Sequence, residues 1–430
     1  MTSQKKGGSG RASTRRRRFL SAVVTTAASG LAGCTVAQDG GPETDNSGSD
    51  TPGTEAPSDG ATGDAAAKGL PTERDKPEPD LWPRFHYDAW NTGARTDTVG
   101  FDDQPTLVWH AQVGKVGPAV VDDGTVFVAE SGDGAVRAFD AASGAKQWVY
   151  EAVGDIPLGV TTVAIDDSAV YVGGERAVHA IDRASGTQRW TFETGGVHVS
   201  TPAVVDGTIY AGAGDTLYAI DSEGNRKWFV KTGTRQIRMP PAVVGETLYL
   251  TTNAMLFAID RESGEERWSL KPAGLTPPSS APTYRYGRLY VAGPEHVYAY
   301  DPAAEGEHVW SSSTFDQVVY QTPTVAHGTV YTGVSLVDNL HALDAETGEQ
   351  TWERNLTVSG SPVATADTVY AVDETDGVLH ALDPHDGSDR WTFTVSGGIY
   401  GQPSVTGDRI YVSGTSPPGQ DNYVFALEDR

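Results

Sequence analysis

The sequence predicts an all-β chain folded as an eight-bladed β-propeller of four-stranded antiparallel blades, closed by N- and C-terminal strands in one blade. Three observations predict this fold. A tryptophan recurs every 38 to 42 residues, an Asp and a Gly stand ahead of it at nearly fixed offsets, and four short β-like runs fill each interval. Short strands repeated at this spacing are typical of propeller blades.

The repeated corner has the form of "AIDRASGTQRW", residues 180–190. Asp can open a tight turn by accepting hydrogen bonds from nearby backbone N–H groups, and Gly can take the positive-φ position that follows. The Trp can then fill the seam to the neighbouring blade. Every blade needs this packing, whereas an enzyme needs one active site, so we interpret the corner as structural and not as a catalytic Asp with a cofactor-stacking Trp. The corner tryptophans are Trp109, Trp148, Trp190, Trp228, Trp268, Trp310, Trp352 and Trp391.

The predicted propeller covers residues 106–430. In each unit, Val, Ile, Leu and Tyr alternate with small or polar residues, which predicts strands. Three such runs follow Trp391 without a further corner, and the lone run "PTLVWHAQ" precedes the first complete unit. Together the two ends would make an eighth blade and leave no open sheet edge. Seven blades with a stray strand is the alternative.

Residues 1–33 have the features of an export signal. Arg16-Arg17 with the following Phe-Leu resembles the twin-arginine export motif, and the apolar run at 19–33 is too short to span a membrane. The run ends in Leu-Ala-Gly-Cys34, which resembles a lipobox, a pattern in which a lipid is attached to the cysteine sulfur. We therefore expect a chain anchored through Cys34 at the extracytoplasmic face of the cell membrane. A signal anchor with an incidental cysteine is the alternative.

Between the signal and the propeller, composition predicts a stalk and a lead-in. Residues 34–79 have almost no large apolar side chain, which predicts a disordered acidic stalk after the lipidated cysteine. Residues 80–105 form the lead-in to the propeller. The formal net charge is −25, and such an acidic surface repels nucleic acid. This acidity resembles that of haloarchaeal proteins, which remain soluble in strong salt.

The corner and the lead-in together resemble a known repeat family. The pattern Ala-x-Asp-x-x-Ser/Thr-Gly-x-x-x-Trp in tandem units, and "WPRFHYDAWNTGARTD" at 82–97, are similar to the pyrroloquinoline-quinone (PQQ) propeller repeat over residues 81–430. That family contains quinoprotein alcohol dehydrogenases and a BamB-like non-enzymatic branch of assembly lipoproteins. The resemblance therefore implies the propeller fold and leaves two functions open, redox catalysis and assembly.

The dehydrogenase branch implies a site that this sequence does not match. Those enzymes have a vicinal disulfide over the quinone, a Trp floor in the channel, and Ca²⁺ held by Glu, Asn and Asp near a catalytic Asp. Cys34 is the single cysteine, and the eight tryptophans of the body are assigned to corners. We therefore expect no catalytic residue, no metal site and no cofactor. PQQ with Ca²⁺ is the alternative, as is a lone Ca²⁺ in the acidic turn at 373–377.

The candidate ligand site lies where the repeats differ. The connections that enter the innermost runs should meet at one mouth of the central channel, and they carry Arg, Gln, Tyr and His side chains suited to an anionic, carbohydrate or peptide ligand. Ordinary polar lining of a water-filled channel is the alternative. The candidates are His198, Arg235, Arg238, Tyr320, Gln321, Tyr400 and Gln402.

These observations predict an exported, membrane-anchored propeller that acts as a binding or assembly scaffold at the cell surface, with no catalysis of its own. Its expected partners are the membrane, through the lipid on Cys34, and a protein, peptide or carbohydrate, but no nucleic acid. A PQQ-dependent alcohol or sugar dehydrogenase is the alternative function, and a sensory ectodomain is a third.

Overall fold

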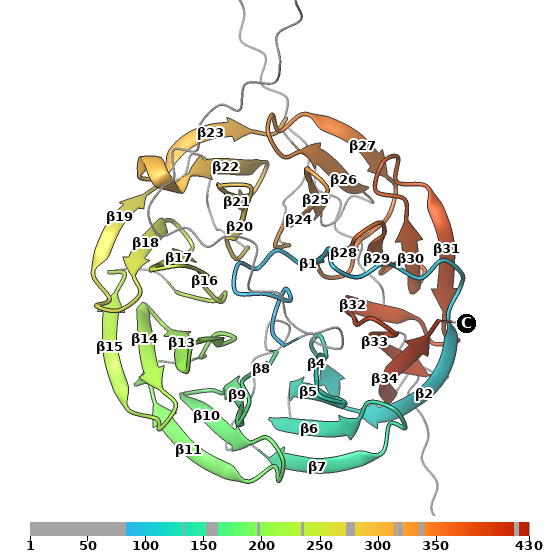
Figure 1. Ribbon diagram of the computed structural model, residues 1–430, viewed down its shortest axis with the longest axis horizontal. Helices are drawn as coiled ribbons and strands as arrows, with labels where there is room; N and C mark the ends of the chain where they lie inside the picture. Colours follow the sequence, from blue (N-terminus) through green and yellow to red (C-terminus); the bar gives the residue numbers. More distant parts are fainter. Residues whose placement is uncertain are drawn as a thin grey trace, which may run out of the picture. The chain divides into compact units, whose positions relative to one another are not determined.

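The computed structural model describes residues 83–131, 134–151, 162–195, 198–233, 236–271, 280–313, 315, 321–334, 339–416 and 421–429. The signal and stalk, with Arg16, Arg17 and Cys34, lie outside the described residues, as do the candidates Arg235 and Tyr320. The described residues form eight sheets of antiparallel strands arranged as blades around a common centre (Figure 1). The predicted all-β, eight-bladed propeller is confirmed.

In blades 1 to 7 the strands follow one another along the chain from a short innermost strand to an outer one (Figure 1). The first four blades comprise β4 (Val120–Asp122), β5 (Thr125–Ser131), β6 (Ala135–Asp140) and β7 (Lys146–Glu151); β8 (Ala164–Ile165), β9 (Ala169–Gly173), β10 (Ala177–Asp182) and β11 (Gln188–Glu193); β12 (Ala203–Val205), β13 (Thr208–Ala213), β14 (Thr216–Asp221) and β15 (Arg226–Lys231); and β16 (Ala242–Val244), β17 (Thr247–Thr251), β18 (Leu256–Asp260) and β19 (Glu266–Leu270). The short β3 (Lys115–Val116) also pairs with β5.

The next three blades repeat the pattern. They comprise β20 (Thr283–Arg285), β21 (Arg288–Ala292), β22 (Val297–Asp301) and β23 (Glu307–Ser311), with the 3-10 turn η1 (Pro302–Ala304); β24 (Thr324–Ala326), β25 (Thr329–Val334), β26 (Asn339–Asp344) and β27 (Gln350–Arg354); and β28 (Val363–Thr365), β29 (Val369–Asp373), β30 (Val378–Leu382) and β31 (Asp389–Thr394). A lead-in strand, β1 (Ala94–Arg95), pairs in parallel with β28.

Blade 8 joins the two ends of the propeller. Its strands are β32 (Ile399–Val405), β33 (Arg409–Ser416), β34 (Asp421–Glu428) and, as the outermost strand, β2 (Thr106–Val113). β2 pairs with β34 along its whole length, from Thr106 opposite Glu428 to Val113 opposite Asn422. The alternative of seven blades with a stray strand is therefore wrong.

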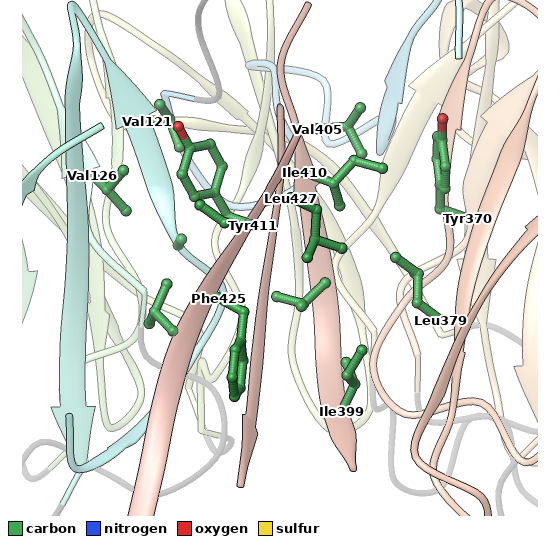
Figure 2. Close-up of a cluster of buried hydrophobic side chains, with 14 of the residues drawn as sticks. Val121, Val126, Tyr370, Leu379, Ile399, Val405, Ile410, Tyr411, Phe425 and Leu427 are labelled. Carbon is green, nitrogen blue, oxygen red and sulfur yellow. The ribbon is translucent and has the colours of Figure 1, made fainter. Parts of the chain in front are cut away.

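Apolar side chains fill both seams of this closing blade. One buried cluster extends from Val121 and Val126 in blade 1, through Ile410 and Leu427 in blade 8, to Tyr370 in blade 7 (Figure 2). Because these side chains come from both ends of the propeller, their burial ties the ends together in addition to the β2–β34 hydrogen bonds.

The Asp–Gly–Trp corners also pack neighbouring blades against one another. In the corner of blade 2, Asp182 Oδ1 accepts the Ser185 backbone N–H at 2.9 Å, and Gly186 follows with φ of 71°. A Cβ built on Gly186 would lie 2.6 Å from the Trp148 ring of the preceding blade, so only glycine leaves room for this indole.

Each corner tryptophan also has a partner ring on the second strand of its own blade, with ring centroids 5.8 to 6.0 Å apart. The partner is a tyrosine in seven blades and Phe127 in blade 1. These tilted aromatic pairs add directional packing to the burial of the indoles.

Candidate functional site

The lead-in lies across the central channel, against the innermost strands of blades 4 to 7 (Figure 1). The backbone N–H groups of these strands donate to four lead-in carbonyls. The pairs are Val243 to Ala89 (2.6 Å), Tyr284 to Trp90 (2.9 Å), Val325 to Thr92 (2.9 Å) and Ala364 to Gly93 (3.0 Å). The inner strands of four blades thus use one stretch of chain as a common partner, and this stretch covers part of the channel.

A local turn shapes the lead-in for this position. Asp88 Oδ1 accepts the backbone N–H groups of Trp90 at 3.0 Å and Thr92 at 2.9 Å, and Asp88 Oδ2 accepts the Thr92 hydroxyl at 2.6 Å. Burial raises the pKa of Asp88, although the hydrogen bonds from Thr92 oppose that change. One side chain thereby fixes the backbone whose carbonyls the inner strands bind.

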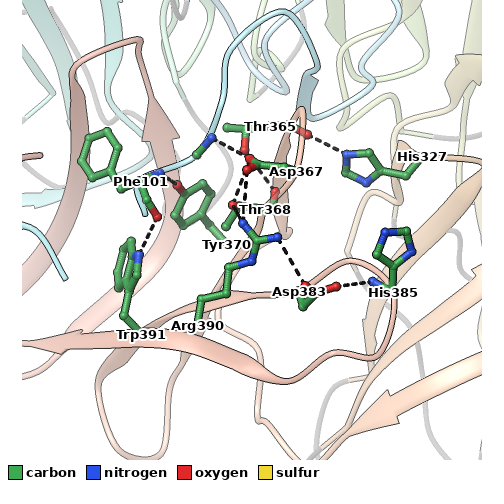
Figure 3. Close-up of polar contacts among 11 residues, drawn as sticks. Phe101, His327, Thr365, Asp367, Thr368, Tyr370, Asp383, His385, Arg390 and Trp391 are labelled. Carbon is green, nitrogen blue, oxygen red and sulfur yellow. Dashed lines mark hydrogen bonds and ion pairs between the residues drawn. The ribbon is translucent and has the colours of Figure 1, made fainter. Parts of the chain in front are cut away.

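The end of the lead-in is fixed to blade 7 (Figure 3). Asp367 Oδ1 accepts the Gly100 N–H at 2.7 Å, and the Tyr370 hydroxyl accepts the Phe101 N–H at 2.9 Å. Arg390 donates to Asp367 Oδ2 at 3.2 Å. Burial alone would raise the pKa of Asp367, but hydrogen bonds from Gly100 and Arg390 lower it overall, so this carboxylate is held ionised.

A cavity of about 670 Å³, which we term the lead-in pocket, lies beside this segment. Its walls are the lead-in and the turns between the first and second strands of blades 2 to 5. Among its lining residues are Arg84, Trp90, Asp166, Asp206, Tyr284 and Arg285. The volume falls within the range that suits a small-molecule or short peptide ligand.

Most acidic groups of the lead-in pocket are already bound within the protein. Asp206 forms an ion pair with Arg261, and Asp97 lies 3.6 Å from Nε of the buried Arg95. Asp166 accepts the Tyr171 hydroxyl at 2.7 Å as well as the backbone N–H of Ser168 at 2.8 Å. Asp88 likewise accepts hydrogen bonds from Trp90 and Thr92. Together these carboxylates stabilise the walls of the lead-in pocket.

The described candidates His198, Arg238 and Gln321 lie on connections that enter inner strands, at the opposite end of these strands from the lead-in pocket. Tyr400 and Gln402 were expected on such a connection but lie within the innermost strand β32. Exposed His198 donates its backbone N–H to the Glu175 backbone carbonyl at 2.6 Å. Exposed Arg238 donates from Nε and Nη2 to Gln236 Oε1 at 3.0 Å and 2.6 Å. Two other candidates, Arg235 and Tyr320, lie outside the described residues. The side chains of His198 and Arg238 are therefore accessible to a ligand, and Arg238 is bonded to its near neighbour Gln236.

The remaining candidates are more enclosed. Gln321 donates to the Val358 carbonyl at 2.6 Å, and the Tyr400 hydroxyl donates to Asn422 Oδ1 at 2.9 Å. Burial raises the pKa of Tyr400 to about 12. Gln402 is buried, and its Nε2 has no hydrogen-bond partner among the described residues. Ligand binding by this group of residues remains a prediction.

The corner indoles are held between blades, and in the described part of the chain no three His, Cys, Asp or Glu side chains group as a metal site requires. The acidic turn at 373–377 closes on itself, because Asp373 Oδ1 accepts the Thr375 N–H at 2.8 Å.

Within the described residues, no helix has the length and apolarity needed to cross a membrane.

A closed ring of eight four-stranded blades joined by tryptophan corners defines the class of PQQ-like propellers. A family model described as "Outer membrane protein assembly factor BamB" matches overlapping stretches that together cover residues 97–430: 97–162, 132–274, 232–335, 253–362, 293–395 and 337–430. The chain belongs to the family that this model describes, which is a family of PQQ-like propellers. No curated protein matches it significantly in sequence.

Solved structures of both branches are similar in fold. BamB from Moraxella catarrhalis is 21% identical with a TM-score of 0.61, over 76% of this chain and 100% of that one. Quinohemoprotein alcohol dehydrogenase ADHIIG from Pseudomonas putida HK5 is 16% identical with a TM-score of 0.68, over 82% and 80%. The corresponding enzyme from Comamonas testosteroni is 16% identical with a TM-score of 0.66, over 81% and 80%. At these identities the likeness shows the fold alone.

The sequence prediction missed the lead-in pocket. It recognised the segment around Trp90 as a lead-in but assigned no binding residue there. A usable signal was present, since Trp90 is outside the corner repeat and Arg84 and Arg95 are cations in a strongly acidic chain. Such residues, which the repeat does not explain, are candidates for a role of their own.

Proposed function

We propose that this chain is an exported, lipid-anchored propeller that acts as a binding or assembly scaffold at the extracytoplasmic face of the cell membrane. The observation that carries the proposal is membership of the BamB family over residues 97–430. The motifs at Arg16-Arg17 and Cys34 support export and lipid attachment. A stalk at 34–79 would let the propeller reach partners away from the membrane.

The proposal includes no catalysis by the chain itself. In its support, the recurrent Asp and Trp side chains are engaged in turns and seams, as Asp182 is with Ser185 and Trp148 is with Gly186. We propose that neither PQQ nor Ca²⁺ is bound. In support, no group of three His, Cys, Asp or Glu side chains among the described residues is placed to hold a metal ion.

The proposed partners are a protein, peptide or carbohydrate at the cell surface. The name of the matching family, an outer-membrane assembly factor, favours a protein. We propose the channel mouth around Arg238 and His198 as the contact region, because both side chains are exposed there. Exposed hydrogen-bonding side chains on loops that a rigid scaffold holds in place are suited to specific recognition of a partner.

Crosslinking and affinity capture from native membranes at high salt test the scaffold role. The expected result is a reproducible partner that is reduced when Arg238 is changed to Glu, with Arg226→Glu on an outer strand as the matched control. No reproducible partner would contradict the proposal. Adding PQQ and Ca²⁺ and following dye reduction with alcohols or sugars tests the alternative, and quinone-dependent turnover would overturn the absence of catalysis.

A further inference from the structure

Three arginines and four aspartates line the lead-in pocket. Two of its lining arginines, Arg84 and Arg285, make no ion pair with any carboxylate among the residues that the structure describes. Arg285 instead donates to two neutral acceptors, the Val325 carbonyl at 3.2 Å and the Thr96 hydroxyl at 3.1 Å. The pocket acids, by contrast, are occupied by N–H, hydroxyl or arginine donors.

Of these two arginines, Arg84 has the fewer hydrogen-bond partners among the described residues. Its Nη1 is buried and has no hydrogen-bond partner among the described residues. Burial lowers the pKa of Arg84 to about 10, so the guanidinium remains charged near neutral pH. Asp88 and Asp206 are near enough to oppose this decrease in pKa, but Nη1 itself has no hydrogen-bond partner among the described residues. A buried donor without a partner is costly, and an anion that enters the pocket would reduce that cost.

Aromatic rings accompany the two cations. Trp90 and Tyr284 meet edge to face, with centroids 5.9 Å apart, and both line the pocket. Tyr286 lies at the rim, half exposed, with the Arg285 guanidinium 5.3 Å from its ring centroid. Such rings supply large apolar contact areas at a low cost in conformational entropy.

We propose that the lead-in pocket binds a carboxylate that carries an apolar or aromatic group. Arg84 would bind the carboxylate, because a guanidinium donates two parallel hydrogen bonds to this group, while Trp90 and Tyr284 contact the apolar part. The ligand is either a free organic acid or the C-terminal carboxylate of a peptide, since both present the same chemistry. This assignment goes beyond the scaffold role and does not depend on it.

The pocket is on the other side of the channel from the predicted mouth, so the two regions can be tested separately. The probes are 3-phenylpropionate and its amide, and the peptide acetyl-Gly-Gly-Phe with a free or an amidated C-terminus. Binding to the full chain is measured by titration calorimetry at high salt. Both acids, or the peptide acid alone, should bind at least about tenfold more tightly than the amides, since the amides cannot form the charge-assisted hydrogen bonds.

The variant Arg84→Met should lower the affinity for the acids about tenfold or more. Arg176→Met is the matched control, because this arginine is 68% exposed and lies outside the pocket, and it should bind as the unaltered chain does. Preference for the peptide acid alone identifies a chain terminus as the ligand source. Equal affinity for acid and amide, or no binding of either acid, overturns the proposal, and this comparison needs no variant to fold.

Discussion

The indole N–H of Trp391 donates to the carbonyl of Phe101 at 2.8 Å, across 290 positions of the sequence. At six other seams the acceptor is the carbonyl of the residue directly after the corner Asp of the next blade, as for Trp148 and the Arg183 carbonyl at 3.0 Å. Blade 8 has no such corner, because its two outer strands are β34 and β2, from opposite ends of the propeller. The lead-in therefore supplies by backbone position the acceptor that the repeat lacks at this seam.

This relationship predicts a specific effect of Trp391→Phe. The variant retains an aromatic ring but loses the donor and part of the buried area, so we expect a decrease in the free energy of unfolding of about 2 kcal/mol. We also expect faster proteolysis of the lead-in, because the Phe101 carbonyl loses its partner. Urea unfolding and limited trypsin digestion measure the two effects.

Trp310→Phe is the control for this prediction. It removes the equivalent hydrogen bond, to the Ala345 carbonyl at 3.1 Å, in a seam between two complete blades. A similar loss of stability is expected, but without faster cleavage of the lead-in. If both variants leave the lead-in equally protected, the Phe101 contact does not hold it.

Glycine substitutions test how closely the corners pack. In Gly186→Ala, the positive φ alone should cost about 1 kcal/mol, and contact of the new Cβ with the Trp148 ring should add about 1–3 kcal/mol. Gly124→Ala is the matched control, since its φ is 69° but nothing lies within 4 Å of its Cβ position. Equal unfolding midpoints in urea for the two variants would show that the seam accommodates a methyl group.

The repeat carried most of the information needed to predict the fold. Because the Asp–Gly–Trp corner recurs at about 40-residue intervals, the blades could be counted, and the incomplete unit at each end predicted their union in blade 8. The aromatic partner of each corner Trp was missed, although Tyr171, Tyr210 and Tyr249 each stand 18–19 residues before a corner tryptophan. Alternation of apolar residues predicts a strand but does not show which ring meets the next.

The candidate site was less accessible to sequence reasoning because it depends on long-range docking. Trp90 reaches the pocket only because the lead-in binds inner strands that lie far along the chain, such as that of Tyr284. No local pattern specifies such a contact. By contrast, the channel-mouth candidates follow from the repeat register alone, and for that reason they could be named from the sequence.

The turn at Asp88 should control how firmly the lead-in is held. Asp88→Ala removes the acceptor for the N–H groups of Trp90 and Thr92 and for the Thr92 hydroxyl. Local opening of the segment becomes easier, so trypsin should cleave after Arg84 or Arg95 at least about tenfold faster. Asp103→Ala changes an exposed lead-in carboxylate and should leave the rate unchanged. Equal rates in the two variants would contradict this role of Asp88.

Buried His86 should make the stability of the propeller depend on pH. Burial lowers the pKa of His86 to about 3, while an unfolded chain has a histidine pKa of about 6.5. Below about pH 6.5 the unfolded state therefore binds a proton that the folded state does not bind until about pH 3. The contribution is complete above pH 6.5 and decreases on acidification, by up to about 1.4 kcal/mol per pH unit.

The variant His86→Asn isolates this proton, since asparagine tolerates the positive φ of 52° at this position. His179, His327 and His341, whose pKa values are also lowered by burial, remain in both chains and cancel in the comparison. Urea unfolding at pH 7, 5.5 and 4.5 should show the unaltered chain losing stability more steeply than the variant. Parallel pH profiles would mean that His86 titrates equally in the folded and unfolded states, and hence that its ring is open to water.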